Sequence, residues 1–173
     1  MYNYKEPFKT EQWYGSGAYS IYPNYIGAQS HIWHDYGCVD SYSYFEISPD
    51  YTFNMRFTYT NSRCVGNNFR LRLMTASGKS LDIKARRSDS SISINLNGDK
   101  RNDYAIAEYA PLLEEYTVND IWVEYNGVTQ TLYVYAAKYD ESKMVTKPSE
   151  PLITYNIDLA ELFEGELSSA CML

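Results

Sequence analysis

Residues 121–137 read IWVEYNGVTQTLYVYAA, two runs of β-branched and aromatic residues on either side of a polar connector. Such residues favour extended strands, in which successive side chains point to opposite faces of a sheet. The connector at 126–130 contains a glycine, and its length is typical of a hairpin loop. The segment therefore predicts two antiparallel strands, at 121–125 and 131–137, joined as a β-hairpin.

The same alternation of apolar and polar residues recurs through the rest of the chain. It predicts further strands at 51–59, 69–73 and 153–157. In 69–73, FRLRL, two arginines alternate with three apolar residues, as in a strand with one wet and one buried face. Roughly eight or more such strands, separated by turn residues, predict an all-β fold, a two-sheet antiparallel jelly-roll sandwich. We expect one domain over 1–173.

Residues 80–98, SLDIKARRSDSSISINLNG, contain two more alternating runs, around Ile83 and Ile94. Between the runs lies a short polar connector that begins with Arg86 and Arg87 and continues through Ser88 and Asp89. Its residue types suit a binding loop, and its length suits a simple turn between two strands. The local pattern leaves both interpretations open.

Helix is nearly absent from the predicted fold. Residues 158–166, DLAELFEGE, predict one or two helical turns with Asp158 as N-cap and Gly165 at the end. Residues 106–116, IAEYAPLLEEY, contain Pro111, which removes a backbone donor. We expect an irregular crossover or short turn there.

Composition narrows the classes of partner. The chain has 173 residues, a net charge of −7 and a pI near 4.8, so its surface repels phosphate backbones and nucleic acid is not expected to bind. No segment has the length and apolarity of a transmembrane helix, so membrane insertion is not expected. No signal peptide is visible at the N-terminus, which leaves a cytoplasmic protein or a mature domain cut from a precursor.

Tyrosine is unusually abundant, with 19 residues against 6 Phe and 3 Trp. Tyrosine suits strands because its ring packs on one side while its hydroxyl stays wet. It also suits sugar-binding surfaces, where rings stack on sugar faces. The β-rich fold is a sufficient explanation by itself, and a stacking surface is the second.

The three cysteines, Cys38, Cys64 and Cys171, have no metal-knuckle spacing and form at most one internal bridge. We favour Cys38–Cys64, because both residues lie near predicted strand ends. Three free thiols remain the alternative.

The segment HIWHDYGCVD, 31–40, gathers residue types that bind zinc. His31, His34, Asp35 and Cys38 would form a ligand set by type, but this spacing converges only on a helix or tight turn. The segment has the pattern of strand and loop, so an exposed aromatic loop is the favoured interpretation.

Two aromatic pairs are candidate platforms for a sugar ring. Trp33 and Tyr36 form the better one, and Trp13 with Tyr14 the second. Packing in the core or at its rim is the common role of such residues.

Catalytic patterns are not found in the sequence. A strand with paired carboxylates, as glycoside hydrolases require, is absent, and Asp158, Glu161 and Glu164 have the spacing of a solvated helical face. There is also no serine nucleophile elbow and no Cys–His pair at a family spacing. We therefore expect a binding protein and not an enzyme.

Residues 121–159 resemble the C-terminal half of the L-type (legume-type) lectin domain in its bacterial form. The resemblance rests on a hairpin strand, its Leu-x-Val partner, a Lys-Pro-x-x-Pro-Leu segment and an Asp-Leu turn. The matching residues are Trp122, Val123, Glu124, Tyr125, Gly127, Leu132, Val134, Lys147, Pro148, Pro151, Leu152, Asp158 and Leu159. Residues 13–24 and 52–59 resemble the family more loosely. The resemblance implies a concanavalin A-like sandwich, a carbohydrate-binding function and an extracellular or cell-surface location.

The resemblance also addresses the connector at 86–90. In this family a Glu-x-Asp strand, an acidic loop and a His hold a transition metal and a calcium ion, and the calcium fixes the sugar-binding loop. Those positions correspond here to Asp82, Lys84 and Ser91. Calcium prefers six to eight oxygen ligands, several of them carboxylates, and a lysine brings an ammonium instead. We therefore expect no metal cofactor, and a simple turn at the connector.

The family's sugar-gripping Asp precedes a Gly and an aromatic strand, and VGNNFRL places Val65 at that position. The amides of Asn67 and Asn68 are the proposed substitutes. The full set of candidate ligand-binding residues is Asn67, Asn68, Arg86, Arg87, Asp89, Trp33 and Tyr36.

The resemblance thus predicts a metal-independent module for carbohydrate recognition or adhesion, with a glycan or glycoprotein as partner. A degenerate lectin fold that serves as a structural or protein-interaction module is the alternative, and a glycoside hydrolase is a third, less supported one. The family's last core strand corresponds to the divergent GELSSACML at the end of the chain.

Overall fold

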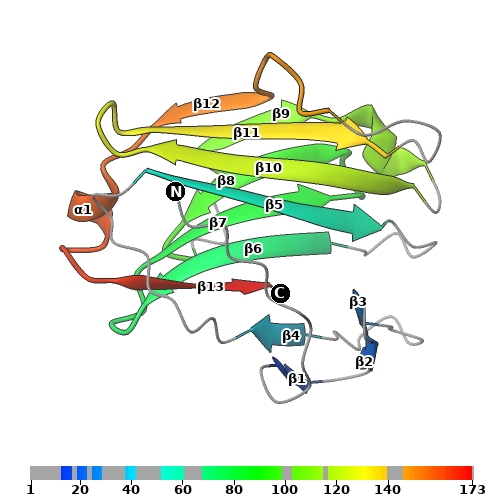
Figure 1. Cartoon of the computed structure of the whole chain (residues 1–173), viewed down its shortest axis with the longest axis horizontal. Helices are drawn as coiled ribbons and strands as arrows, with labels where there is room; N and C mark the ends of the chain where they lie inside the picture. The colour runs from blue at the N-terminus through cyan, green and yellow to red at the C-terminus, as the bar shows by residue number, and fades with distance from the viewer. Residues whose placement is uncertain are drawn as a thin grey trace.

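The computed structural model describes residues 13–16, 19–22, 25–28, 38–41, 52–60, 68–98, 103–114, 117–139 and 146–172. Two antiparallel sheets lie face to face (Figure 1). The four-stranded sheet has the order β12 (Ile153–Asn156), β11 (Thr131–Lys138), β10 (Val118–Asn126) and β5 (Phe53–Thr60). The five-stranded sheet has the order β13 (Ser168–Met172), β6 (Asn68–Thr75), β7 (Ser80–Arg86), β8 (Ser91–Leu96) and β9 (Ala105–Glu108).

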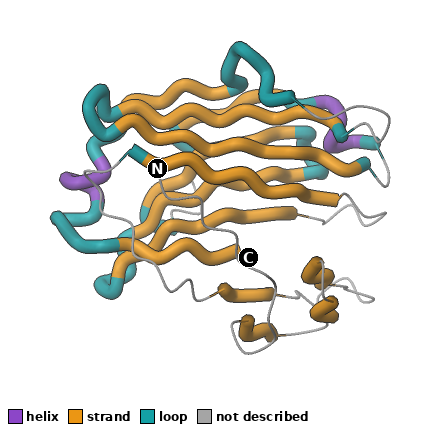
Figure 2. The backbone as a smooth tube through the Cα atoms, viewed as in Figure 1, coloured by secondary structure: helices purple, strands orange, loops and turns teal. Residues whose placement is uncertain are grey.

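Two small two-stranded sheets complete the described strands. One pairs β1 (Trp13–Ser16) with β4 (Cys38–Ser41), and the other pairs β2 (Tyr19–Tyr22) with β3 (Tyr25–Ala28). They lie beside the β13 edge of the larger sheet, and strands dominate the whole described chain (Figures 1 and 2). The predicted all-β, two-sheet sandwich is confirmed. Within the described residues, no helix is long and apolar enough to cross a lipid bilayer.

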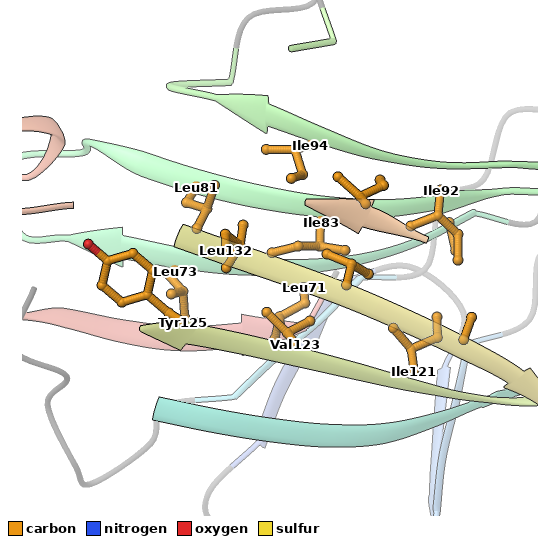
Figure 3. Close-up of a cluster of buried hydrophobic side chains, with 14 of the residues drawn as sticks. Leu71, Leu73, Leu81, Ile83, Ile92, Ile94, Ile121, Val123, Tyr125 and Leu132 are labelled. Carbon is orange, nitrogen blue, oxygen red and sulfur yellow. The ribbon is translucent and has the colours of Figure 1, made fainter. Parts of the chain in front are cut away.

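The core lies between the two sheets and follows the predicted alternation (Figure 3). One face of β6, β7 and β8 supplies leucines and isoleucines, and the facing side of β10 and β11 supplies apolar partners. The labelled core residues are Leu71, Leu73, Leu81, Ile83, Ile92, Ile94, Ile121, Val123, Tyr125 and Leu132, and all are buried. Because every second residue is committed to this core, the residues between them must face outward.

The predicted hairpin is present as β10 and β11, joined by a turn at residues 127–130. The Asn126 side chain stabilises the turn, because its Oδ1 accepts the backbone N–H groups of Val128 and Thr129 at 2.9 and 3.1 Å. The left-handed position is taken by Gln130, with φ of 51°. Turn formation here rests on the asparagine side chain more than on Gly127.

The short helix α1 (Leu159–Leu162) also agrees with the sequence. Asp158 Oδ1 accepts the N–H groups of Ala160 and Glu161, and Gly165 follows the helix at φ of 76°. The buried Tyr125 connects this helix to the sheet. Its hydroxyl donates to the Ile157 carbonyl at 3.2 Å and accepts the Leu159 N–H at 3.3 Å.

The expectation of an irregular crossover at 106–116 is partly wrong. The structure has strand β9 at Ala105–Glu108 and then a 3-10 turn, η2 (Ala110–Leu113), that begins around Pro111. The alternation was hidden because small alanines, Ala105 and Ala107, face the core while Ile106 is 60% exposed. In this edge strand the small residues face the core, and the large apolar residue faces outward.

Replacement of Leu81 by alanine should lower the free energy of unfolding by about 2–5 kcal/mol, because the leucine is fully buried between the sheets. Chemical denaturation measures the change. Leu113→Ala is the control, since Leu113 is exposed and should change stability by less than about 0.5 kcal/mol. Equal losses for both variants would contradict the packing described here.

Replacement of Tyr125 by phenylalanine should cost about 1–3 kcal/mol, because the Leu159 N–H loses its acceptor in a buried site. Tyr104→Phe, at an exposed position, should leave stability unchanged. Urea unfolding of the three proteins tests this, and a Tyr125→Phe variant as stable as the parent would show that the hydroxyl is not needed.

Candidate functional site

The outer face of the five-stranded sheet is strongly charged. Since the leucines and isoleucines of β6, β7 and β8 point into the core, the alternate residues of the same strands form this face. They are Arg70, Arg72, Asp82, Lys84, Arg86, Ser91, Ser93 and Asn95. The strand register places Arg72 opposite Asp82 and Arg70 opposite Lys84. Cross-strand neighbours of this kind are close enough to form ion pairs.

Asp82 is fully buried, yet its charge is compensated. Arg72 Nε donates to Asp82 Oδ1 at 2.7 Å, and Arg72 Nη2 donates to Oδ2 at 2.9 Å. The two parallel bonds form the bidentate arrangement that arginine makes with carboxylates. Arg70 Nε lies 3.8 Å from the same carboxylate. Both oxygens of Asp82 are therefore engaged by guanidinium groups.

Lys84 and Arg86 meet a second carboxylate, Asp103, which lies two residues before β9. Arg86 Nη2 is 2.8 Å from Asp103 Oδ2, and Lys84 Nζ is 3.7 Å from Oδ1. The Lys84 side chain is only 13% exposed. Burial lowers the pKa of Lys84, and the nearby Asp103 carboxylate opposes that shift. The ammonium is thus held in a partly dry site beside an anion.

The connector at residues 87–90 is a compact turn between β7 and β8. Arg86 Nη2 lies 3.2 Å from Asp89 Oδ2, and Ser91 Oγ donates to Asp89 Oδ1 at 2.7 Å. Ser90 takes a left-handed conformation with φ of 46°, and its carbonyl accepts the Tyr109 N–H. The interpretation of this connector as a strand-to-strand turn is confirmed.

Of the predicted ligand-binding residues, Arg86 and Asp89 are brought into direct contact. Asn68 begins β6 and pairs in register with Arg86, so its backbone lies beside them. Arg87 diverges, since its Nη2 donates to the Leu113 carbonyl in η2 at 3.4 Å.

Other predicted residues lie outside the residues whose side chains the structure describes. They include Asn67, Trp33 and Tyr36 of the ligand-binding set, Val65, the zinc set His31, His34, Asp35 and Cys38, and the Cys38–Cys64 pair. Within the described part of the chain, no cluster of three or more His, Cys, Asp or Glu residues could hold a metal ion.

Sequence reasoning missed three members of the charged face. The sequence pattern places Arg70 and Arg72 on the solvent-facing side of their strand. Asp82 and Lys84 alternate in the same way on the neighbouring strand. This matching alternation of charged residues on two consecutive strands could have indicated the ion pairs. The contact of Asp103 with the cluster could not be predicted locally. Asp103 lies several residues after β8, and only the return of the chain in the fold brings it close to Arg86.

The cations implied by the family resemblance do not fit these residues. Four cationic side chains converge on three carboxylates, and they form what we call the ion-pair network: Arg70, Arg72, Lys84 and Arg86 with Asp82, Asp89 and Asp103. Calcium needs several free oxygens, whereas here each carboxylate already faces an arginine or a lysine. A divalent ion would also meet an excess of positive charge.

On the outer face of the four-stranded sheet, two cationic side chains lie over aromatic rings. Lys147 Nζ donates to Glu124 Oε1 at 2.7 Å and lies 4.2 Å from the centre of the Tyr135 ring. The hydrogen bond to Glu124 raises the pKa of Lys147. Arg56 similarly covers Trp122 at 5.3 Å and pairs with the buried Asp120. The Lys-Pro and Trp-Val-Glu motifs thus hold the chain against this sheet.

An open hollow of about 360 Å³ lies near α1. Lys79, Asn97, Asp158, Glu161 and Glu164 are among its lining residues, and Lys79 Nζ is 2.7 Å from Glu164 Oε1. None of the predicted ligand-binding residues lines it. The carboxylates here serve the helix cap and a surface ion pair.

Known proteins share this architecture. The chain superimposes on the lectin from Bauhinia forficata in complex with GalNAc with a TM-score of 0.67 at 12% identity, over 95% of this chain and 86% of that one. The winged bean acidic lectin complexed with methyl-α-D-galactose gives 0.70 at 11% identity, over 96% and 85%. Arcelin-5, a lectin-like defense protein from Phaseolus vulgaris, gives 0.66 at 11%, over 96% and 85%.

The fold is therefore of the concanavalin A-like, legume lectin type. A search of curated proteins found no match. The sequence model of the legume lectin domain matches residues 72–170, more than half of the chain and the part that holds β10, β11 and all of the charged face except Arg70. On this ground the chain belongs to the legume lectin domain family.

Proposed function

We propose that this protein is a carbohydrate-recognition or adhesion module that binds a glycan or glycoprotein without a bound metal ion. The observation that carries the proposal is the position of the charged face within a lectin fold. The loop end of β6–β8 presents Arg86, Asp89 and the start of β6, and sugar hydroxyls pair well with such donors and acceptors.

The ligand would contact the loop end of this sheet. Arg86, Arg87 and Asp89 would bond its hydroxyl groups, Asn67 and Asn68 would supply amide contacts, and Trp33 and Tyr36 would stack on a sugar face. Structural relatives were solved with GalNAc and with methyl-α-D-galactose, which supports a sugar as the class of ligand. The protein acts by binding and not by catalysis, and it works outside the cell or at its surface.

A second candidate is a structural or protein-interaction module built on the same fold. The Arg72–Asp82 pair favours it, because a fully buried carboxylate cannot be reached by a sugar. The two candidates differ in whether any glycan binds.

A glycan array probed with the purified protein should show binding that survives EDTA and does not increase with calcium and manganese, because the carboxylates face arginine and lysine. Binding only in the presence of metal would overturn metal independence. No binding in either condition would move the assignment to the structural module.

The combined Asn67→Ala, Arg86→Ala and Arg87→Ala variant should lose at least about tenfold in affinity for the best glycan, as expected when several charged hydrogen bonds are removed. Arg87→Ala alone should give a smaller loss, because it removes only one of the three side chains. Lys147→Ala is the matched control, since its ion pair with Glu124 of β10 belongs to the other sheet. Unchanged affinity in the combined variant, with the fold checked by circular dichroism, would rule out this face.

A further inference from the structure

We infer that the ion-pair network itself fastens the connector at 87–90 and the chain at Asp103 to the sheet, and so does with side-chain charges what a bound cation would otherwise do. The inference goes beyond glycan binding, because it concerns how the face is held and stands whether or not a sugar binds there. It rests on geometry, burial and charge balance.

Arg86 is the centre of this arrangement. One guanidinium nitrogen, Nη2, lies 2.8 Å from Asp103 and 3.2 Å from Asp89. The same group donates to Ser91 Oγ, with Nε at 3.4 Å and Nη2 at 3.3 Å. The planar guanidinium offers five N–H donors in fixed directions, which suits a bridge between two carboxylates. The β7–β8 hairpin and the chain before β9 are joined through this one side chain.

The network is too buried to behave as ordinary surface ion pairs. Asp82 is fully buried, Asp103 is 12% exposed at its side chain, and Arg86 is 26% exposed. Exposed pairs contribute little to stability, whereas removal of one partner from a buried pair leaves an uncompensated charge. Asp82 and Asp103 therefore require positive partners, and the chain supplies them from its own strands.

The charge balance explains why a divalent ion is not needed. Four cations against three carboxylates give the cluster a net positive charge before any ion arrives. A metal would have to displace Arg72 from both Asp82 oxygens and then sit near the Lys84 ammonium. Both steps oppose binding. The carboxylates are positioned by arginine and lysine side chains of the chain itself.

Two properties distinguish the network from a metal site. Chelators leave it unchanged, because its cations are covalently part of the chain. High salt weakens its more exposed contacts, of which Arg86–Asp89 is one, since Asp89 is 49% exposed.

Hydrogen exchange of the full chain, followed by mass spectrometry, tests the inference without any sugar. Arg86→Met should raise exchange in peptides covering 87–91 and 103–109 by about tenfold or more, because local opening becomes easier there. Lys147→Met, which removes the ion pair with Glu124 of β10 on the other sheet, should leave those peptides unchanged. Arg86→Lys keeps the charge, loses the bridge, and should fall between the parent and Arg86→Met.

The unmodified protein gives an independent test that does not depend on any variant folding. EDTA should leave exchange in both peptides unchanged, and concentrated sodium chloride should raise it at 87–91. Terbium, used as a luminescent calcium substitute, should not bind at these residues. Chelator-sensitive exchange, terbium binding abolished by Asp82→Asn, or an Arg86→Met variant that exchanges like the parent would overturn the inference. A lack of glycan binding would contradict the proposed function but would leave this inference intact.

Discussion

The strict alternation of side chains along β6, β7 and β8 is the constraint on which the rest of the molecule depends. Leu73, Leu81 and Ile94 fill the space between the sheets, so Arg72, Asp82 and Asn95 are forced to the other side of the same strands. The core and the charged face are thus two consequences of one pattern. A one-residue slip in register would bury the arginines among leucines and is strongly disfavoured.

The two outer faces of the sandwich compensate their charged groups in different ways. On the five-stranded sheet, buried carboxylates are neutralised by guanidinium groups from neighbouring strands. On the four-stranded sheet, cations lie over rings, as Lys147 does over Tyr135 and Arg56 over Trp122. Both arrangements hide polar groups without leaving a charge uncompensated. They also explain how a chain with a net charge of −7 concentrates its positive charge where its fold needs it.

Most of the fold could be predicted from the sequence, because each predicted strand has one face of large apolar residues that must be buried. Strand β9 was missed for the opposite reason: its core-facing residues are Ala105 and Ala107, which carry little hydrophobic signal. The candidate site was harder to predict from the sequence than the fold. Asp82, Lys84 and Arg86 could be placed on one strand face, but their pairing with Arg72 and Asp103 depends on strand order and on a return of the chain that no local pattern encodes.

The contacts around Lys147 have a practical consequence for labelling the protein. Before β12, Lys147 is held by Glu124 and Tyr135; after β11, the Tyr139 N–H donates to the Val118 carbonyl at 2.7 Å. The described chain on either side of residues 140–145 is thus anchored to the four-stranded sheet. A fluorophore or affinity peptide inserted between these two anchored stretches would be tethered at both ends on the opposite sheet from the arginine-rich surface. Such a handle would leave the Arg72–Asp82 and Arg86–Asp103 contacts of the five-stranded sheet in place.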